Sequence, residues 1–126
     1  MFSERQISAL KTVCHCLEEQ GLKFALGGSG LLAIHGFNSE ISDWDITTDA
    51  PLANVLEAAE EFDSHLLSRN GIFVSKYVVR FSLDGVSFDI LGGFALKARD
   101  AIFELVTKVT GLWNEIPLGC VLEWEK

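Results

Sequence analysis

The stretch FALGGSGLLAIHGFNSEISDWDITTD, from Phe24 to Asp49, carries the strongest structural signal in this chain. It predicts a short buried strand, a glycine turn at Gly27-Gly28, a helix, a loop and a second strand. In that second strand Asp43 and Asp45 flank Trp44. Because side chains alternate along a strand, we expect both carboxylates on one face, whereas a helix would turn them about 200° apart.

The predicted chemistry is the handling of phosphate. Gly27 and Gly28 would let the backbone approach a bulky anion, and the amides at the start of the following helix favour negative charge. Ser29 adds a hydroxyl at the expected N-cap of that helix. A triphosphate bound on this turn could be bridged by Mg²⁺ to Asp43 and Asp45, since carboxylates are preferred magnesium ligands.

A hairpin is predicted further along the chain, at Asp84-Gly85, between two alternating runs of the segment from Lys76 to Leu91. Counting back from a two-residue turn gives four cross-strand pairs: Leu83 with Val86, Ser82 with Ser87, Phe81 with Phe88, and Arg80 with Asp89. Asp89 would then lie on the face opposite its apolar neighbours Phe88 and Ile90. A cross-strand ion pair with Arg80 is one interpretation of this acid.

The glycine turn and the acidic pair resemble the signature of the nucleotidyltransferase superfamily, the polymerase-beta-like minimal nucleotidyltransferases. That signature is a Gly-Gly or Gly-Ser turn followed, after one helix, by Asp-x-Asp or Asp-x-Glu, and the match is LGGS at 26–29 with DWDI at 43–46. The continuation ITTDA at 46–50 is similar to the head domain of tRNA nucleotidyltransferases and bacterial poly(A) polymerases. The segment GSGLLAIHG at 28–36 is similar to antibiotic adenylyltransferases and to small members of toxin-antitoxin and phage-defence pairs.

The resemblance covers roughly residues 22–95 and implies an α/β (α+β) fold, a mixed sheet with helices packed on it. The length of 126 residues predicts one such domain, residues 1–126. It implies Mg²⁺ bound by Asp43 and Asp45, and a third catalytic carboxylate on a later strand, which Asp89 matches. Gly27, Gly28 and Ser29 would bind the nucleotide. Arg80 would orient Asp89 or contact the phosphates.

The remaining segments predict further elements. A helix from Ser3 to Gln20 would start with a capping box between Ser3 and Gln6 and end at Gly21. Apolar residues at helical spacing from Leu52 to Leu66 predict a further helix, with Pro51 in its first turn and Asn70-Gly71 stopping it. Asp49 or Ala50 would lie near its cap, and Asp49 would cap it or serve as another metal ligand. The pattern also predicts β structure at Ile72–Val74, a helix at Ala95–Val109 and a closing edge strand at Ile116–Val121.

Composition limits the classes of partner. The 10 basic and 18 acidic residues give a net charge of −8, and the basic residues are scattered, so binding of long nucleic acid is not expected. No stretch is typical of a membrane span or signal peptide, so we expect a cytoplasmic protein. Three cysteines, at 14, 16 and 120, suggest reduced thiols, and Cys14-His15-Cys16 in a helix cannot converge on zinc.

Two functions remain open from the sequence. The first is transfer of a nucleoside monophosphate from ATP or another triphosphate to an acceptor hydroxyl on a small molecule or a protein, with release of pyrophosphate. The second is a silent or partner-dependent binding module, such as an antitoxin, regulator or nucleotide sensor. Leu31-Leu32 replaces the Arg-Asp pair of tRNA-type heads, and we expect no helical portion that closes over the acceptor after the strands. A partner chain, or a homodimer formed through the C-terminal segment, is compatible with either function.

Overall fold

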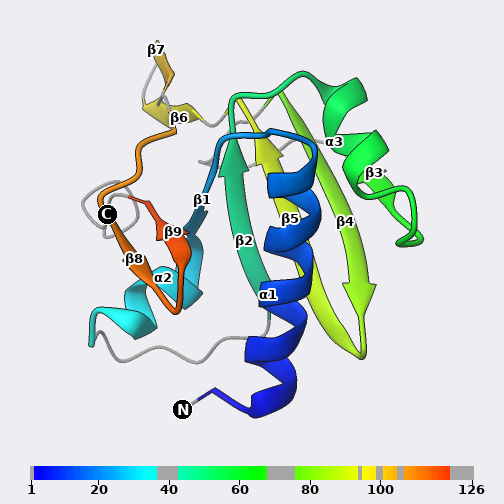
Figure 1. Cartoon of the computed structure of the whole chain (residues 1–126). Coiled ribbons are helices and arrows are strands. Elements are labelled where there is room, and N and C mark those ends of the chain that lie inside the picture. Colours follow the sequence, from blue (N-terminus) through cyan, green and yellow to red (C-terminus); the bar gives the residue numbers. More distant parts are fainter. Residues whose placement is uncertain are drawn as a thin grey trace.

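The computed structural model describes residues 2–36, 43–67, 76–93, 95–98, 101–104 and 107–119. Its helices are α1 (Glu4–Glu19), α2 (Gly28–Ile34) and α3 (Leu52–Ala58). The main sheet contains β1 (Phe24–Gly27), β2 (Asp43–Thr48), β3 (His65–Leu67), β4 (Tyr77–Leu83), β5 (Val86–Gly92), β8 (Gly111–Trp113) and β9 (Ile116–Leu118). Strands β6 (Ala95–Ala98) and β7 (Ala101–Glu104) form a separate antiparallel pair (Figure 1).

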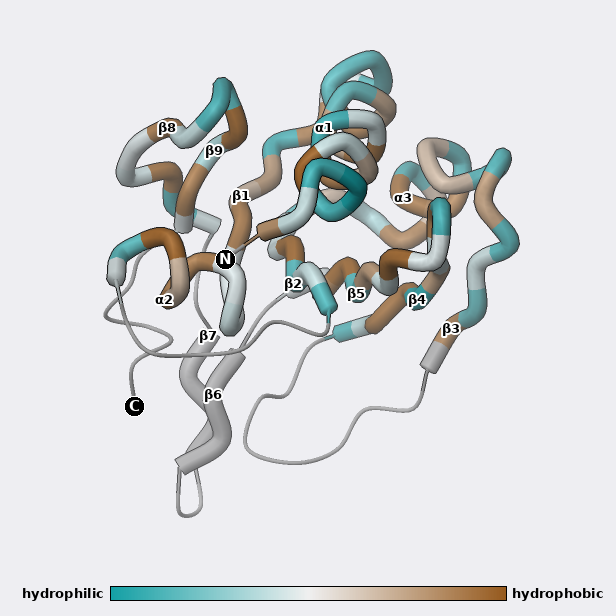
Figure 2. Tube along the Cα trace, turned by 90° about the horizontal axis from the view of Figure 1, so that it is seen from below, coloured by the Kyte–Doolittle hydropathy of each residue, from teal (hydrophilic) through white to brown (hydrophobic). Residues whose placement is uncertain are grey.

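The main sheet is mixed, with the strand order β3-β4-β5-β2-β1-β9-β8. Strands β2 and β5 are parallel, as are β1 and β9, and the other neighbours are antiparallel. Helices α1 and α3 lie together on one side of strands β2, β5 and β4 (Figure 2). The predicted α/β architecture, a mixed sheet with helices packed on it, is therefore confirmed.

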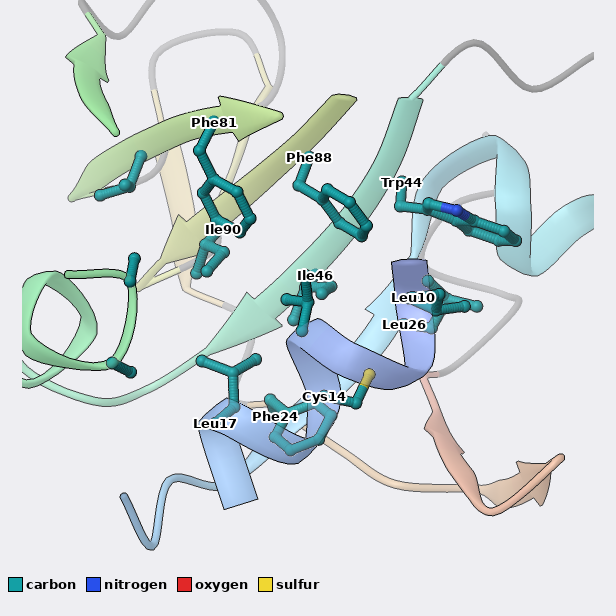
Figure 3. Packing of buried hydrophobic residues seen from close by; sticks show 14 of the residues in the cluster. Leu10, Cys14, Leu17, Phe24, Leu26, Trp44, Ile46, Phe81, Phe88 and Ile90 are labelled. Atoms are coloured by element: carbon teal, nitrogen blue, oxygen red, sulfur yellow. The ribbon is translucent and has the colours of Figure 1, made fainter. Parts of the chain in front are cut away.

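The hydrophobic core lies between the sheet and α1. Trp44 and Ile46 on β2 and Phe88 and Ile90 on β5 are at most 1% exposed. They point towards α1, whose buried stripe includes Leu10, Cys14 and Leu17 (Figure 3). Because strand side chains alternate, this packing turns the intervening acidic residues of β2 and β5 to the other face.

Two local predictions are confirmed in detail. The Ser3 hydroxyl accepts a hydrogen bond from the Gln6 amide at 3.1 Å, and the Gln6 side chain accepts one from the Ser3 amide at 2.8 Å. This is the predicted capping box. The turn at Asp84-Gly85 joins β4 and β5 in the predicted register, so that Arg80 is paired with Asp89.

The predicted helix that begins at Pro51 is shorter than expected, and the predicted helix at 95–109 is wrong in type. Helix α3 ends at Ala58, and Leu66 instead lies in β3, paired with Val79 of β4. Residues 95–98 and 101–104 form the strands β6 and β7. Apolar spacing in short segments fits both periodicities, and pairing with a neighbouring strand decides between them.

The C-terminal strand is confirmed, but its place in the sheet differs from the prediction. β9 lies between β1 and β8, so β8 is the edge strand on this side. The amide of Gly119 donates to the carbonyl of Leu26 at 2.8 Å, which ties this segment to the strand before the glycine turn. The predicted β structure at Ile72–Val74 lies outside the described residues. In the part of the chain that is described, no helix is long and apolar enough to cross a membrane.

Candidate functional site

One row of aligned residues crosses five strands of the sheet. Gly27 on β1 pairs with Asp45 on β2, Asp45 with Asp89 on β5, Asp89 with Arg80 on β4, and Arg80 with His65 on β3. Directly paired residues on neighbouring strands project to the same face of a sheet. The row therefore brings Asp45, Asp89 and Arg80 together on the face opposite α1, and Asp43, two residues before Asp45, shares that face.

The glycine turn is in contact with the acidic strand. Gly28 has a φ of 61°, and a Cβ added to it would overlap the carboxylate of Asp45. Glycine is therefore required here both for the left-handed backbone and for the close approach of Asp45. Ser29 is the second residue of α2, and Gly27 holds the N-cap position, so the predicted capping role of Ser29 is wrong. Gly27, the first residue of the turn, holds the N-cap position because α2 starts directly at the end of β1.

Asp45 is held in an environment that disfavours its charge. Burial, followed by the charges of Asp89 and Asp43, raises the pKa of Asp45 to about 7, and Arg80 offsets only part of this effect. Three carboxylates close together with one guanidinium leave a local excess of negative charge. A cation in this place would remove that penalty, since an opposite charge favours the ionised carboxylate.

Asp89 forms the cross-strand ion pair with Arg80. The Arg80 Nε donates to Asp89 Oδ1 at 2.7 Å, and Nη2 donates to Oδ2 at 2.9 Å. The Arg80 side chain is 49% exposed and that of Asp89 13% exposed. The contact with Asp89 raises the pKa of Arg80 above its usual range. Both oxygens of Asp89 are thus engaged by a fixed planar donor.

The donor atoms on this face are carboxylate oxygens, which Mg²⁺ prefers as ligands. The negative charge of the buried Asp45 is only partly compensated by Arg80, which also favours a bound cation. Asp43 and Asp45 on β2, with Asp89 on β5, are the residues that would hold the ion. Within the described ranges, no three acidic, histidine or cysteine side chains already converge in a metal-binding arrangement. The Asp89 oxygens face the Arg80 guanidinium instead.

Asp49 has a structural role that differs from its predicted one. Its carboxylate accepts hydrogen bonds from the Thr107 amide at 3.0 and 3.2 Å and from the Thr107 hydroxyl at 3.2 Å. The N-cap of α3 is Pro51, without a side-chain cap, so the capping interpretation of Asp49 is wrong. Asp49 fastens the chain near residue 107 to the end of β2, because the buried Thr107 needs acceptors for its polar groups.

Two residues of this face were missed by the sequence interpretation. His65 is paired with Arg80 because residues 65–67 form a strand, whereas the apolar spacing had placed them at the end of a helix. Ser87 is paired with Asp43 through the parallel contact of β2 and β5. The register counted from the turn at Asp84-Gly85 predicts Ser87 on the same face as Asp89. The local sequence, however, contains no signal for the pairing of β2 with β5.

Cys14, His15 and Cys16 belong to no cluster of three or more potential metal ligands among the described residues. Burial raises the pKa of the Cys14 thiol to about 12. Cys16 donates a hydrogen bond to Glu61 at 3.1 Å, and burial with this contact raises its pKa to about 11. His15 lies against Glu19 at 2.8 Å on the surface of α1. The three side chains diverge around the helix, as the spacing of neighbouring helical residues requires.

No family model matches this chain, and neither does any curated protein sequence. Solved structures do match its fold. A protein from Thermotoga maritima (TM1012), provisionally assigned as a nucleotidyltransferase, has a TM-score of 0.76 and 20% identity, and the match covers 98% of this chain and 81% of that one. ANT(2")-Ia in complex with adenylyl-2"-tobramycin has a TM-score of 0.59 and 12% identity, covering 93% of this chain and 69% of that one.

JHP933 from Helicobacter pylori matches with a TM-score of 0.52 and 15% identity, over 98% of this chain and 55% of that one. At these identities the likenesses concern the fold. This chain has a nucleotidyltransferase-like fold, in agreement with the resemblance of its glycine turn and acidic pair.

Proposed function

We propose that this chain is a Mg²⁺-dependent nucleotidyltransferase that moves a nucleoside monophosphate from ATP or another nucleoside triphosphate to an acceptor hydroxyl. The acceptor is a small molecule or a protein. A location in the cytoplasm, where triphosphates and reduced thiols are found, is part of this proposal. Long nucleic acid is a poor acceptor for a chain with a net charge of −8 and scattered basic residues.

In the proposed reaction the acceptor oxygen attacks the α-phosphorus, the bond to the bridging α,β-oxygen breaks, and pyrophosphate leaves. Bound Mg²⁺ would supply charge stabilisation at the attacking and leaving oxygens. Asp43 and Asp45 would hold the ion that binds the triphosphate. Gly27, Gly28 and Ser29 contact the phosphates, with the hydroxyl and backbone amides as donors. Asp89 accepts the acceptor proton or serves as a further metal ligand.

The observation that carries this proposal is the direct pairing of Asp45 with Asp89 while Gly28 lies against the Asp45 carboxylate. Three separate parts of the sequence thus bring a glycine turn and acidic groups to one place, and this supports the proposal. The fold shared with ANT(2")-Ia, solved with an adenylylated antibiotic, supports a small hydroxylic acceptor as one option.

The test uses each nucleoside triphosphate labelled at the α-phosphate, incubated with Mg²⁺ and a cell extract. Label should move to a small molecule or a protein. Asp43→Asn and Asp45→Asn should each reduce transfer by about 100-fold or more, because both remove a ligand charge. Asp49→Asn is the matched control, since Asp49 binds Thr107, and it should retain transfer. Undiminished transfer by Asp45→Asn would end the assignment.

The second candidate is a binding module that takes up nucleotide without turnover. The observation in its favour is the engagement of both Asp89 oxygens by Arg80. Such a module should bind a labelled triphosphate but release no pyrophosphate, alone or with a copurifying partner chain. Transfer of label to any acceptor by the isolated chain would exclude it.

A further inference from the structure

The ion pair between Arg80 and Asp89 lies at the centre of the row that crosses the sheet. Arg80 is paired directly with Asp89, and Asp89 directly with Asp45. The guanidinium presents two nitrogens to the two carboxylate oxygens at 2.7 and 2.9 Å. A bidentate contact of this kind occupies the side of a carboxylate on which a metal ion would bind. Asp89 therefore has a cation partner already.

The guanidinium also acts on the other two acids. Its charge lowers the pKa of Asp45, and the charges of Asp43 and Asp45 add to the effect of Asp89 on Arg80. One positive charge is thus shared by three carboxylates. It compensates Asp89 best, because the hydrogen bonds are to that residue, and leaves Asp45 the least compensated.

The Arg80 side chain is also free to move away from Asp89. Its side chain is 49% exposed, whereas Asp89 is 13% exposed, so the arginine can rotate into solvent while the acid stays in the sheet. A long side chain with a charged end moves at low cost when its stem remains on the strand. An arriving triphosphate would offer the guanidinium several anionic oxygens in exchange for one carboxylate.

We propose that Arg80 is a positioning residue that holds Asp89 in place of a divalent cation and transfers its contact to the phosphates when the nucleotide-metal complex binds. This inference rests on the proposed function. Arg80 competes with the metal ion for Asp89 when nucleotide is absent, and it attracts the triphosphate when both are present. The arginine therefore couples metal binding to nucleotide binding.

The first measurement is Mn²⁺ binding to the full chain without nucleotide, followed by electron paramagnetic resonance of the free ion. Arg80→Gln should bind Mn²⁺ roughly three- to tenfold more tightly than the unchanged chain, because the competing cation is gone. Arg5→Gln removes the same charge from the exposed start of α1 and should bind as the unchanged chain does.

A double-mutant cycle separates competition for Asp89 from a general effect of charge. In an Asp89→Asn background, Arg80→Gln should change Mn²⁺ affinity by less than about twofold, since the carboxylate to which Arg80 hydrogen-bonds is gone and only the weaker effect of its charge on Asp43 and Asp45 remains. If Arg80→Gln raised the Mn²⁺ affinity equally in both backgrounds, the proposed exchange would be overturned. Only a general electrostatic effect of the Arg80 charge would then be left.

The second measurement is binding of a non-hydrolysable triphosphate analogue in the presence of Mg²⁺. Arg80→Gln should weaken it by about tenfold, which is opposite in sign to its effect on Mn²⁺ alone. If Mn²⁺ binds the unchanged chain and Arg80→Gln with equal affinity, the inference fails while the metal site stands. If Mn²⁺ binds the unchanged chain no more tightly than Asp45→Asn, the proposed function itself fails.

Discussion

Gly28 lies against the carboxylate of Asp45, so closely that a Cβ on Gly28 would come within 2.9 Å of the Asp45 Cβ and Cγ. The glycine turn and the acidic strand therefore form one surface, although the two residues are far apart in sequence. A phosphate on the turn would lie beside the carboxylate that has the greatest need of a cation.

Replacing Gly28 with alanine should separate this contact from backbone strain. Gly28 and Gly21 have similar φ values, 61° and 70°, but a Cβ at Gly21 would meet nothing within 4 Å. Each substitution should cost about 1 kcal/mol for the left-handed backbone. Only Gly28→Ala should also weaken Mn²⁺ binding, by about tenfold or more, because it displaces Asp45. Equal Mn²⁺ affinity of the two variants would contradict the contact.

Replacing Asp45 with asparagine should stabilise the metal-free protein. The pKa of Asp45 is raised from 3.8 to about 7, so the folded state resists its ionisation. Asp45 therefore lowers the free energy of unfolding. This effect is absent below pH 3.8, grows between pH 3.8 and 7, and is complete above pH 7. In EDTA, Asp45→Asn should raise the free energy of unfolding by about 1–2 kcal/mol at pH 8 and by little near pH 4.

Urea unfolding at both pH values measures this difference. Asp63→Asn, at an exposed position, is the control and should be neutral. A variant of Asp45 that is less stable at pH 8 than the unchanged chain would mean that the carboxylate cluster is compensated in the metal-free fold.

Tyr77 is the single tyrosine of the sequence, so its ionisation can be followed directly at 295 nm. Its hydroxyl donates to the Ala50 carbonyl at 2.6 Å, and burial followed by the charge of Asp49 raises its pKa to about 12. The folded protein should show no tyrosinate near pH 10. Because the folded pKa is raised, the stability that Tyr77 contributes is complete below pH 10 and is lost as pH rises towards 12.

Tyr77→Phe should abolish this pH dependence and cost about 1 kcal/mol at neutral pH through the lost hydrogen bond. An ionisation midpoint near 10 in a folded sample, verified by circular dichroism, would contradict the buried contact.

The turn between β8 and β9 contains a glutamate in an unfavourable conformation. Asn114 and Glu115 have φ values of 51° and 68°, a combination for which asparagine followed by glycine is preferred. Glu115→Gly should therefore raise the free energy of unfolding by about 0.5–1 kcal/mol. Glu115→Ala keeps a Cβ at the left-handed position and should bring no such gain. Thermal unfolding of the two variants gives the comparison.

The sequence predicts the strand register and the orientation of side chains correctly where these depend on local patterns. The hairpin register followed from Asp84-Gly85, because a two-residue turn fixes every pair of the two strands. The alternation around Trp44 placed Asp43 and Asp45 on one face, because only one face of β2 is packed on α1. From these two features the sequence alone predicts that Arg80 is paired with Asp89 and that Asp43 and Asp45 share one face of their strand.

Contacts between segments that are far apart in the sequence could not be predicted from local patterns. Leu66 fits a helical apolar spacing as well as a strand, and only its pairing with Val79 decides the matter. His65 was therefore missed beside Arg80. Likewise, the acceptor of the Thr107 amide is Asp49, 58 residues away, and no local rule predicts a hydrogen bond across that separation.

Strand β9 joins β1 in parallel, and this order has a consequence for biosynthesis. Residues 24–27 are made long before residues 116–118, so this edge of β1 lacks its partner on the growing polypeptide until β9 leaves the ribosome. An exposed edge invites pairing with other nascent chains. The strand that carries the glycine turn is consequently among the last to be protected, and cells expressing this protein would benefit from chaperone cover during translation.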